Sequence, residues 1–196
     1  YANIVAGMGR HRNITHYTSP FRFHAAPPGS VLLRPATAVS NRSGYKNFTI
    51  TSALDGVGNS LVAGALPGYM KKNSEQVEVG RVTLDDVMRH EHHGVYLLKI
   101  DSQGHEYHIL QGCQQYMRTH PVYMIFFEYY PKGLLAHGTD PITLLEFMQH
   151  RGYTCFNIRD SPVGALSFEE FVAKYPATDH GWGKFTDLAC IRLDLL

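Results

Sequence analysis

Residues 95–112 read VYLLKIDSQGHEYHILQG, and this stretch decides the fold class. The run from Val95 to Ile100 is almost wholly apolar and ends at Asp101, which is typical of a strand covered on both faces of a parallel sheet. Gly104 allows the chain to turn tightly. A helix is then expected, because apolar residues recur at helical spacing: Ile109, Leu110, Cys113, Tyr116 and Met117. The stretch therefore predicts strand, turn and helix in succession.

The same alternation continues on both sides of this stretch. Helix starts are expected at Thr83, at Asp140-Pro141 and at the capping box of Ser167 and Glu170. Strands are expected at 31–39, 48–51, 122–127, 155–158 and 188–193, with irregular chain at 1–30 and a long loop at 54–75. This order predicts an α/β, doubly wound, Rossmann-like fold, with a mostly parallel sheet and helices on both faces. Periodicity leaves the direction of the last strand open.

Length and composition indicate one globular domain and exclude several classes of protein. The chain has 196 residues, 44% of them hydrophobic, which suffices for one sizeable core. Its net charge of +1 argues against a nucleic-acid partner, which would require a basic face. The sequence has no apolar stretch of about 18 residues, so no membrane span is expected. The oligomeric state is left open.

The cysteines and the glycosylation patterns favour different cellular compartments. Cys113, Cys155 and Cys190 are far apart in sequence and form no CxxC pair, so we expect reduced, mostly buried thiols and no zinc site. A cytoplasmic location follows, and no targeting segment is visible. A secretory route stays open, because Asn13, Asn41 and Asn47 each begin an Asn-X-Ser/Thr triplet.

Residues 98–112 resemble the signature of the FkbM-family methyltransferases. That signature runs lysine, aliphatic, aspartate, any residue, glutamate, glycine, any residue, glutamate, and ends with an aliphatic pair and a glycine. The resemblance extends to the segments 38–41, 58–61, 82–86, 127–128 and 140–153. It is best over about residues 30–160, and we treat 1–196 as a single FkbM-like domain.

The resemblance implies an S-adenosylmethionine-dependent methyltransferase that acts on an oxygen, with a hydroxyl of a sugar or another small metabolite as acceptor. The expected partner is thus a small-molecule methyl acceptor. The resemblance implies that Asp101 orients or deprotonates the acceptor, with Glu128 second and His105 as a further candidate base. The cofactor-binding residues that it implies are Ala38, Val39, Lys99, Asp101, Gln103, Gly104 and Glu106.

The chain departs from the family pattern in two places. Gln103 stands where the family usually has glutamate, so the negative charge is lost there. The family's apolar strand, acid and glycine-rich turn, which hold the methionine part of the cofactor, have no counterpart: Ala6-Gly7-Met8-Gly9 lacks the preceding acid. We therefore expect an N-terminally truncated form of the fold. A non-catalytic, degenerate binding module that lacks the cofactor site remains the alternative.

A histidine cluster at His90, His92 and His93 offers close-spaced imidazoles that could bind zinc or nickel. It joins a predicted helix to a predicted strand and lacks a fixed fourth ligand. We therefore expect an exposed loop, and no metal site is predicted.

Overall fold

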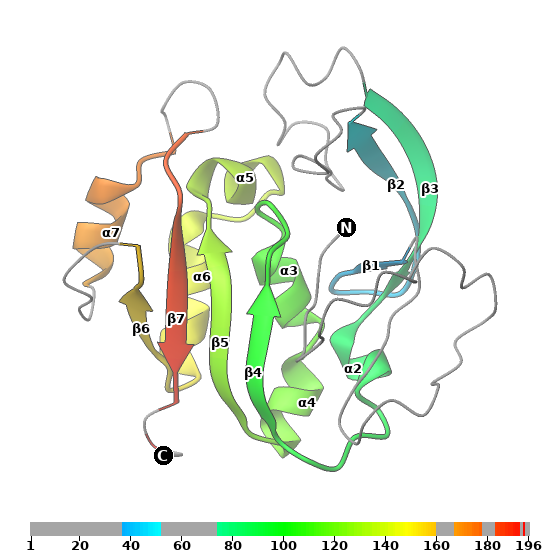
Figure 1. The fold of residues 1–196 in the computed structure, drawn as a ribbon, viewed down its shortest axis with the longest axis horizontal. Helices are drawn as coiled ribbons and strands as arrows, with labels where there is room; N and C mark the ends of the chain where they lie inside the picture. Colours follow the sequence, from blue (N-terminus) through cyan, green and yellow to red (C-terminus); the bar gives the residue numbers. More distant parts are fainter. Residues whose placement is uncertain (1–36, 52–73, 160–166, 178–182, 193, 195–196) are drawn as a thin grey trace.

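The computed structural model describes residues 37–51, 74–159, 167–177, 183–192 and 194. The larger of two sheets contains β4 (Val95–Ile100), β5 (Val122–Tyr129), β7 (Thr186–Ile191) and β6 (Thr154–Asn157), in that order (Figure 1). β4 and β5 run parallel, whereas β7 runs antiparallel to both of its neighbours. The open question of the last strand is therefore settled as antiparallel.

The smaller sheet has the order β1-β3-β2 and is built from β1 (Thr37–Val39), β3 (Ser74–Val82) and β2 (Gly44–Thr51). β3 pairs parallel with β1 and antiparallel with β2. This sheet stands beside the larger one (Figure 1). The two are connected through α2 (Leu84–Val87), which begins where β3 ends. As expected, the Thr83 hydroxyl caps α2 by accepting a hydrogen bond from the Asp86 N–H at 3.0 Å.

Helices connect the strands of the larger sheet along the chain. α3 (Glu106–Gln111) and α4 (Gln114–Thr119) connect β4 to β5, and α5 (Pro131–Ala136) and α6 (Pro141–His150) connect β5 to β6. α7 (Phe168–Lys174) follows β6 and begins with the expected capping box of Ser167 and Glu170. In Figure 1, α3, α4 and α6 lie behind the sheet, where they cover the buried side chains of β4 and β5.

The prediction of a mostly parallel sheet is wrong for the described part of the chain. Each of the two sheets contains one parallel pair and is otherwise antiparallel. The error arose because a continuous apolar run reports burial on both faces and carries no information on strand direction. The α/β class itself is confirmed, with strands and helices alternating from β3 to β7.

Three local predictions also need correction. The single helix expected over 109–117 is divided into α3 and α4 at Gly112 and Cys113. The sequence analysis did not foresee the nine-residue strand β3, whose first residues were placed in the 54–75 loop, or the helix α5. The remainder of that loop and residues 1–36 lie outside the described residues.

The prediction of reduced cysteines is wrong for two of the three. Cys155 and Cys190 lie directly opposite each other on β6 and β7 and form a disulfide. The antiparallel register of β6 and β7 places the two cysteines opposite each other, although they are 35 residues apart in sequence. Cys113 is a buried free thiol, as expected. Asn41 and Asn47 are exposed, whereas Asn13 lies outside the described residues. In the described ranges, no helix has the length and apolar character to cross a membrane.

Candidate functional site

Four carboxyl groups gather where β4 and β5 end and β7 begins. The register pairs Ile100 with Phe127, so Asp101 and Glu128 follow neighbouring positions on parallel strands. Glu128 in turn lies opposite Asp187 on β7. The fourth group is Glu106, the first residue of α3. We call Asp101, Glu106, Glu128 and Asp187 the acidic rim.

Glu106 is fully buried at the start of α3. Its Oε1 accepts hydrogen bonds from the Ser102 N–H at 3.0 Å, the Ser102 hydroxyl at 2.9 Å and the Gly104 N–H at 3.2 Å. These bonds fasten the turn between β4 and α3. Burial nevertheless raises the pKa of Glu106 to about 7, since the hydrogen bonds compensate only part of the desolvation. Oε2 has no hydrogen-bond partner among the described residues.

The pKa of Glu128 is raised further than that of Glu106. Burial raises its pKa to about 8, and the negative charges of Glu106, Asp101 and Asp187 add to the effect. Its Oε2 is also buried without a hydrogen-bond partner in the described part of the chain. A buried carboxyl group whose oxygen has no hydrogen-bond partner costs free energy. That cost falls when the group binds a proton, or when a hydrogen-bond donor or a cation lies beside it.

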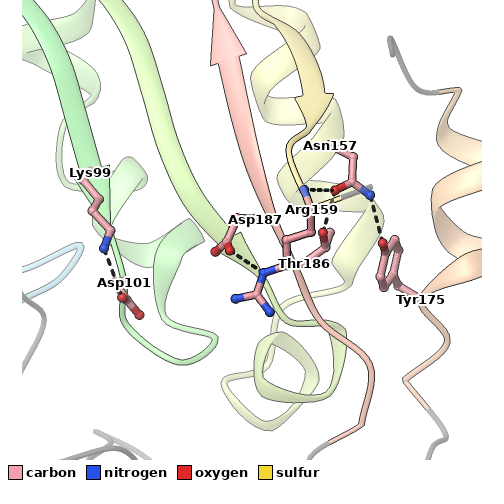
Figure 2. Close-up of polar contacts among 7 residues, drawn as sticks. All are labelled: Lys99, Asp101, Asn157, Arg159, Tyr175, Thr186 and Asp187. Carbon is pink, nitrogen blue, oxygen red and sulfur yellow. Dashed lines mark hydrogen bonds and ion pairs between the residues drawn. The ribbon is translucent and has the colours of Figure 1, made fainter. Parts of the chain in front are cut away.

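Asp101 differs from both glutamates because it is accessible. Its side chain is 44% exposed and lies 3.5 Å from the ammonium of Lys99, measured from Oδ2 to Nζ. This ion pair gives the Lys99 ammonium a charged partner (Figure 2). The pair is half-exposed, so it contributes little to stability.

The rim continues into a polar network on β6 and β7 (Figure 2). The buried Asn157 donates to the Tyr175 hydroxyl at 2.9 Å and accepts from the Thr186 hydroxyl at 2.7 Å. Arg159 donates to Asp187 Oδ2 at 2.5 Å. Sequence analysis missed these residues, because the spacing along the chain gives no sign that they meet.

The raised pKa of Glu128 predicts how stability depends on pH. The folded-state pKa of about 8 lies above the ordinary glutamate pKa of 4.5, so the stabilisation from proton binding is fully present below about pH 4.5 and is lost as pH rises through 8. We therefore expect Glu128→Gln to raise the free energy of unfolding at pH 8 by roughly 2–4 kcal/mol, at about 1.4 kcal/mol per pKa unit. Near pH 4.5 the gain should vanish.

Urea unfolding of both proteins between pH 4.5 and 9 measures this difference. The matched control is Glu146→Gln at an exposed position of α6, where we expect no gain. A Glu128→Gln protein that is no more stable than wild type at pH 8 would show that Glu128 is solvated and ionised without penalty.

The signature turn is held by a close approach of two glycines. Gly104 has φ +98°, and a Cβ added there would lie 2.2 Å from the carbonyl carbon of Gly133 in α5. The expectation that Gly104 serves a tight turn is therefore confirmed. Gln103 also has a positive φ, of 55°, and its carbonyl oxygen faces Gly133. The backbones of the turn and α5 are thus in direct contact.

His105 points away from the acidic rim. Its ring nitrogens lie 2.9 Å from His137 Nδ1 and 2.9 Å from the Ser40 hydroxyl. Burial, with smaller contributions from nearby His137 and His108, lowers the pKa of His105 to about 2. The Ser40 contact connects the signature turn to the end of β1, where Ala38 and Val39 are buried. The structure thus brings the end of β1 next to the signature turn.

The cluster of His90, His92 and His93 is exposed, in keeping with the expected loop. Within the described ranges, no group of three or more histidine, cysteine or acidic residues is arranged to hold a metal ion.

Comparison with known proteins gives one match. A family model described as the methyltransferase FkbM domain matches residues 21–155, which is more than half of the chain. No curated protein and no solved structure gave a significant match.

Proposed function

The chain belongs to the FkbM methyltransferase family, and from that premise we propose that it transfers a methyl group from S-adenosylmethionine to a hydroxyl oxygen of a sugar or another small metabolite. The matched range includes the whole signature and the acids Asp101, Glu106 and Glu128. The observation that carries the proposal is the position of these acids. They meet at the carboxyl end of two parallel strands, where α/β sheets bind ligands.

The chemistry of the acidic rim suits the cofactor. S-adenosylmethionine carries a sulfonium and an ammonium group, and both are cations. Glu106 and Glu128 each present a buried oxygen that has no partner among the described residues, which is what a bound cation or N–H donor would satisfy. When bound, the cofactor supplies an electrophilic methyl group on a good leaving group. We propose Asp101, Gln103 and Glu106 as its contacts on the signature turn, with Ala38 and Val39 beside it.

The chain's own residues must align the acceptor and remove its proton. Asp101 is suited to both tasks, because its carboxylate is half-exposed and its orientation is held by Lys99. Glu128 is second: with a pKa of about 8 it is mostly protonated at neutral pH. Gly104 and Glu106 keep the turn in shape, through the backbone contact with Gly133 and the three hydrogen bonds at Oε1.

His105 is the weakest of the three candidate bases. Both of its ring nitrogens are engaged by protein partners, and its side chain is only 5% exposed. An imidazole with a pKa of about 2 takes up a proton only at a large cost. We therefore assign proton removal to Asp101 and then to Glu128, and place His105 in a binding role.

For the compartment, the Cys155–Cys190 disulfide supports the secretory alternative over a cytoplasmic location, since disulfides persist in oxidising compartments. The exposed positions of Asn41 and Asn47 agree with it.

Transfer of label from tritiated S-adenosylmethionine to a panel of sugars, glycosides and small alcohols tests the proposal. Label in a product that is stable to base indicates an ether and supports O-methylation of a hydroxyl. Label lost as methanol on base treatment would indicate a methyl ester and an acid as acceptor. Absence of transfer to any acceptor would favour the non-catalytic binding module, which the neutral Gln103 also favours.

A further inference from the structure

A second polar site lies beside the signature turn. It is a cavity of about 310 Å³ lined by Ser40, Asn41, Arg42, Lys46, Arg81, His105, His108 and His137, which we call the basic pocket. The residues come from four places: the β1–β2 connection, the β2–β3 pair, α3 with its N-cap, and the end of α5. No acid is among these lining residues.

Three cationic side chains converge on the basic pocket. Burial lowers the pKa of Lys46, and the positive charges of Arg81 and Arg42 lower it further. Burial and the charge of Arg42 likewise lower the pKa of Arg81. Lys46 and Arg81 therefore both lie close to other positive charges. In the described part of the chain, neither Lys46 nor Arg81 forms an ion pair.

The pocket also holds unsatisfied polar atoms. Arg81 Nε and His108 Nδ1 are buried, and neither has a hydrogen-bond partner within the described ranges. Arg81 is held between two strands, opposite Ala38 of β1 and Gly44 of β2. A guanidinium N–H that is buried without an acceptor costs free energy, and an anion in the pocket would remove that cost.

His108 supplies a further donor. The rings of His105 and His108 stack with centroids 4.6 Å apart, and the His105–His137 bond fixes their orientation. Burial lowers the pKa of His137 to about 4, so its ring is neutral at pH 7. Burial also lowers the pKa of His108, and a neutral imidazole carries one N–H that can donate to an oxygen. His105 and His108 occupy positions that the family signature leaves free.

We propose that the basic pocket binds a sulfate or phosphate group carried by the methyl acceptor, so that the enzyme methylates a sulfated or phosphorylated metabolite. This inference rests on the proposed function. Cations and N–H donors that approach from three segments suit a tetrahedral anion with several acceptor oxygens better than a flat carboxylate. His105 lines the pocket and Glu106 belongs to the acidic rim, so the two sites are neighbours along the chain, and we place the hydroxyl of the acceptor toward Asp101 and Glu128.

Calorimetric titration of the full chain with inorganic phosphate and inorganic sulfate, at pH 7 and low ionic strength, tests the site without the cofactor. We expect saturable binding of one anion per chain, weakened about tenfold by Arg81→Gln and similarly by Lys46→Gln, since each removes one charge-assisted contact. Lys46→Gln also covers the case in which Arg81→Gln fails to fold. Arg118→Gln, at an exposed position of α4, removes the same charge outside the pocket and should leave binding unchanged.

The inference is overturned if neither anion binds saturably, or if Arg118→Gln weakens binding as much as the pocket variants do. Competition distinguishes the two anions: a sugar phosphate or a sugar sulfate should displace the inorganic ion, and the corresponding neutral sugar should not. Anion binding without any methyl transfer would refute the proposed function and leave the anion site standing. Methyl transfer to neutral acceptors without anion binding would refute only the anion site.

Discussion

Asp101→Asn is expected to lower the turnover number for methyl transfer by about 100-fold or more, the range typical of a lost general base. The asparagine keeps the shape of the side chain and its access to solvent, but it can no longer accept a proton or attract a cation. The ion pair with Lys99 is also lost, yet both partners are about half-exposed. Stability should therefore change by less than about 1 kcal/mol.

Initial rates with tritiated S-adenosylmethionine, together with thermal unfolding of both proteins, measure the two effects separately. Lys99→Met is the matched control, because it removes the ion pair and keeps the carboxylate. We expect it to lower turnover less than about tenfold, since it alters only the orientation of Asp101. If Asp101→Asn retains full turnover, the assignment of Asp101 as the base is wrong.

Gly104→Ala is expected to cost at least about 3 kcal/mol of folding free energy. The new Cβ would lie 2.2 Å from the carbonyl carbon and 2.5 Å from the Cα of Gly133. Those atoms belong to the backbone of α5, so they cannot rotate away as a side chain would. Overpacking costs of about 1–3 kcal/mol add to the cost of a positive φ at a residue other than glycine. Urea unfolding of both proteins measures the difference.

The variant Gly138→Ala separates the cost of a positive φ from the cost of the steric clash. Gly138 has φ +77°, but a Cβ there would meet nothing within 4 Å. The variant thus carries the cost of the backbone conformation alone, which we expect to be about 1 kcal/mol. A Gly104→Ala protein that is no less stable than Gly138→Ala would mean that the turn and α5 do not touch.

Local features of the fold could be predicted because their causes are local. The cap at Thr83, the capping box at Ser167 and the turn at Gly104 each depend on residues within three or four positions. The split of the helix at Gly112 has a distant cause. A Cβ at Gly112 would lie 2.1 Å from the carbonyl oxygen of Ser40, and its own carbonyl accepts from the Asp85 N–H. The helical spacing of apolar residues gives no indication that Gly112 meets Ser40 and Asp85.

The acidic rim and the basic pocket also differ in how far their residues could be predicted from local sequence. The acidic rim could be predicted in part, because Asp101 and Glu128 each end an apolar strand and the strands are consecutive. Asp187 could not, since its place depends on the antiparallel register of β7. The basic pocket was missed altogether: His105 and His108 were visible in the signature, but their partners Lys46, Arg81 and His137 come from segments that only the tertiary fold brings near.

Calorimetric titration of the chain with S-adenosylmethionine tests the central claim most directly. If the acidic rim holds the cofactor, binding should be saturable with one site per chain, displaced by S-adenosylhomocysteine, weakened by Asp101→Asn and unaffected by Arg81→Gln. Saturable binding that Asp101→Asn leaves unchanged would contradict the placement of the cofactor at the rim. A titration with no heat of binding would contradict the methyltransferase account of this chain and favour a binding module that has lost the cofactor.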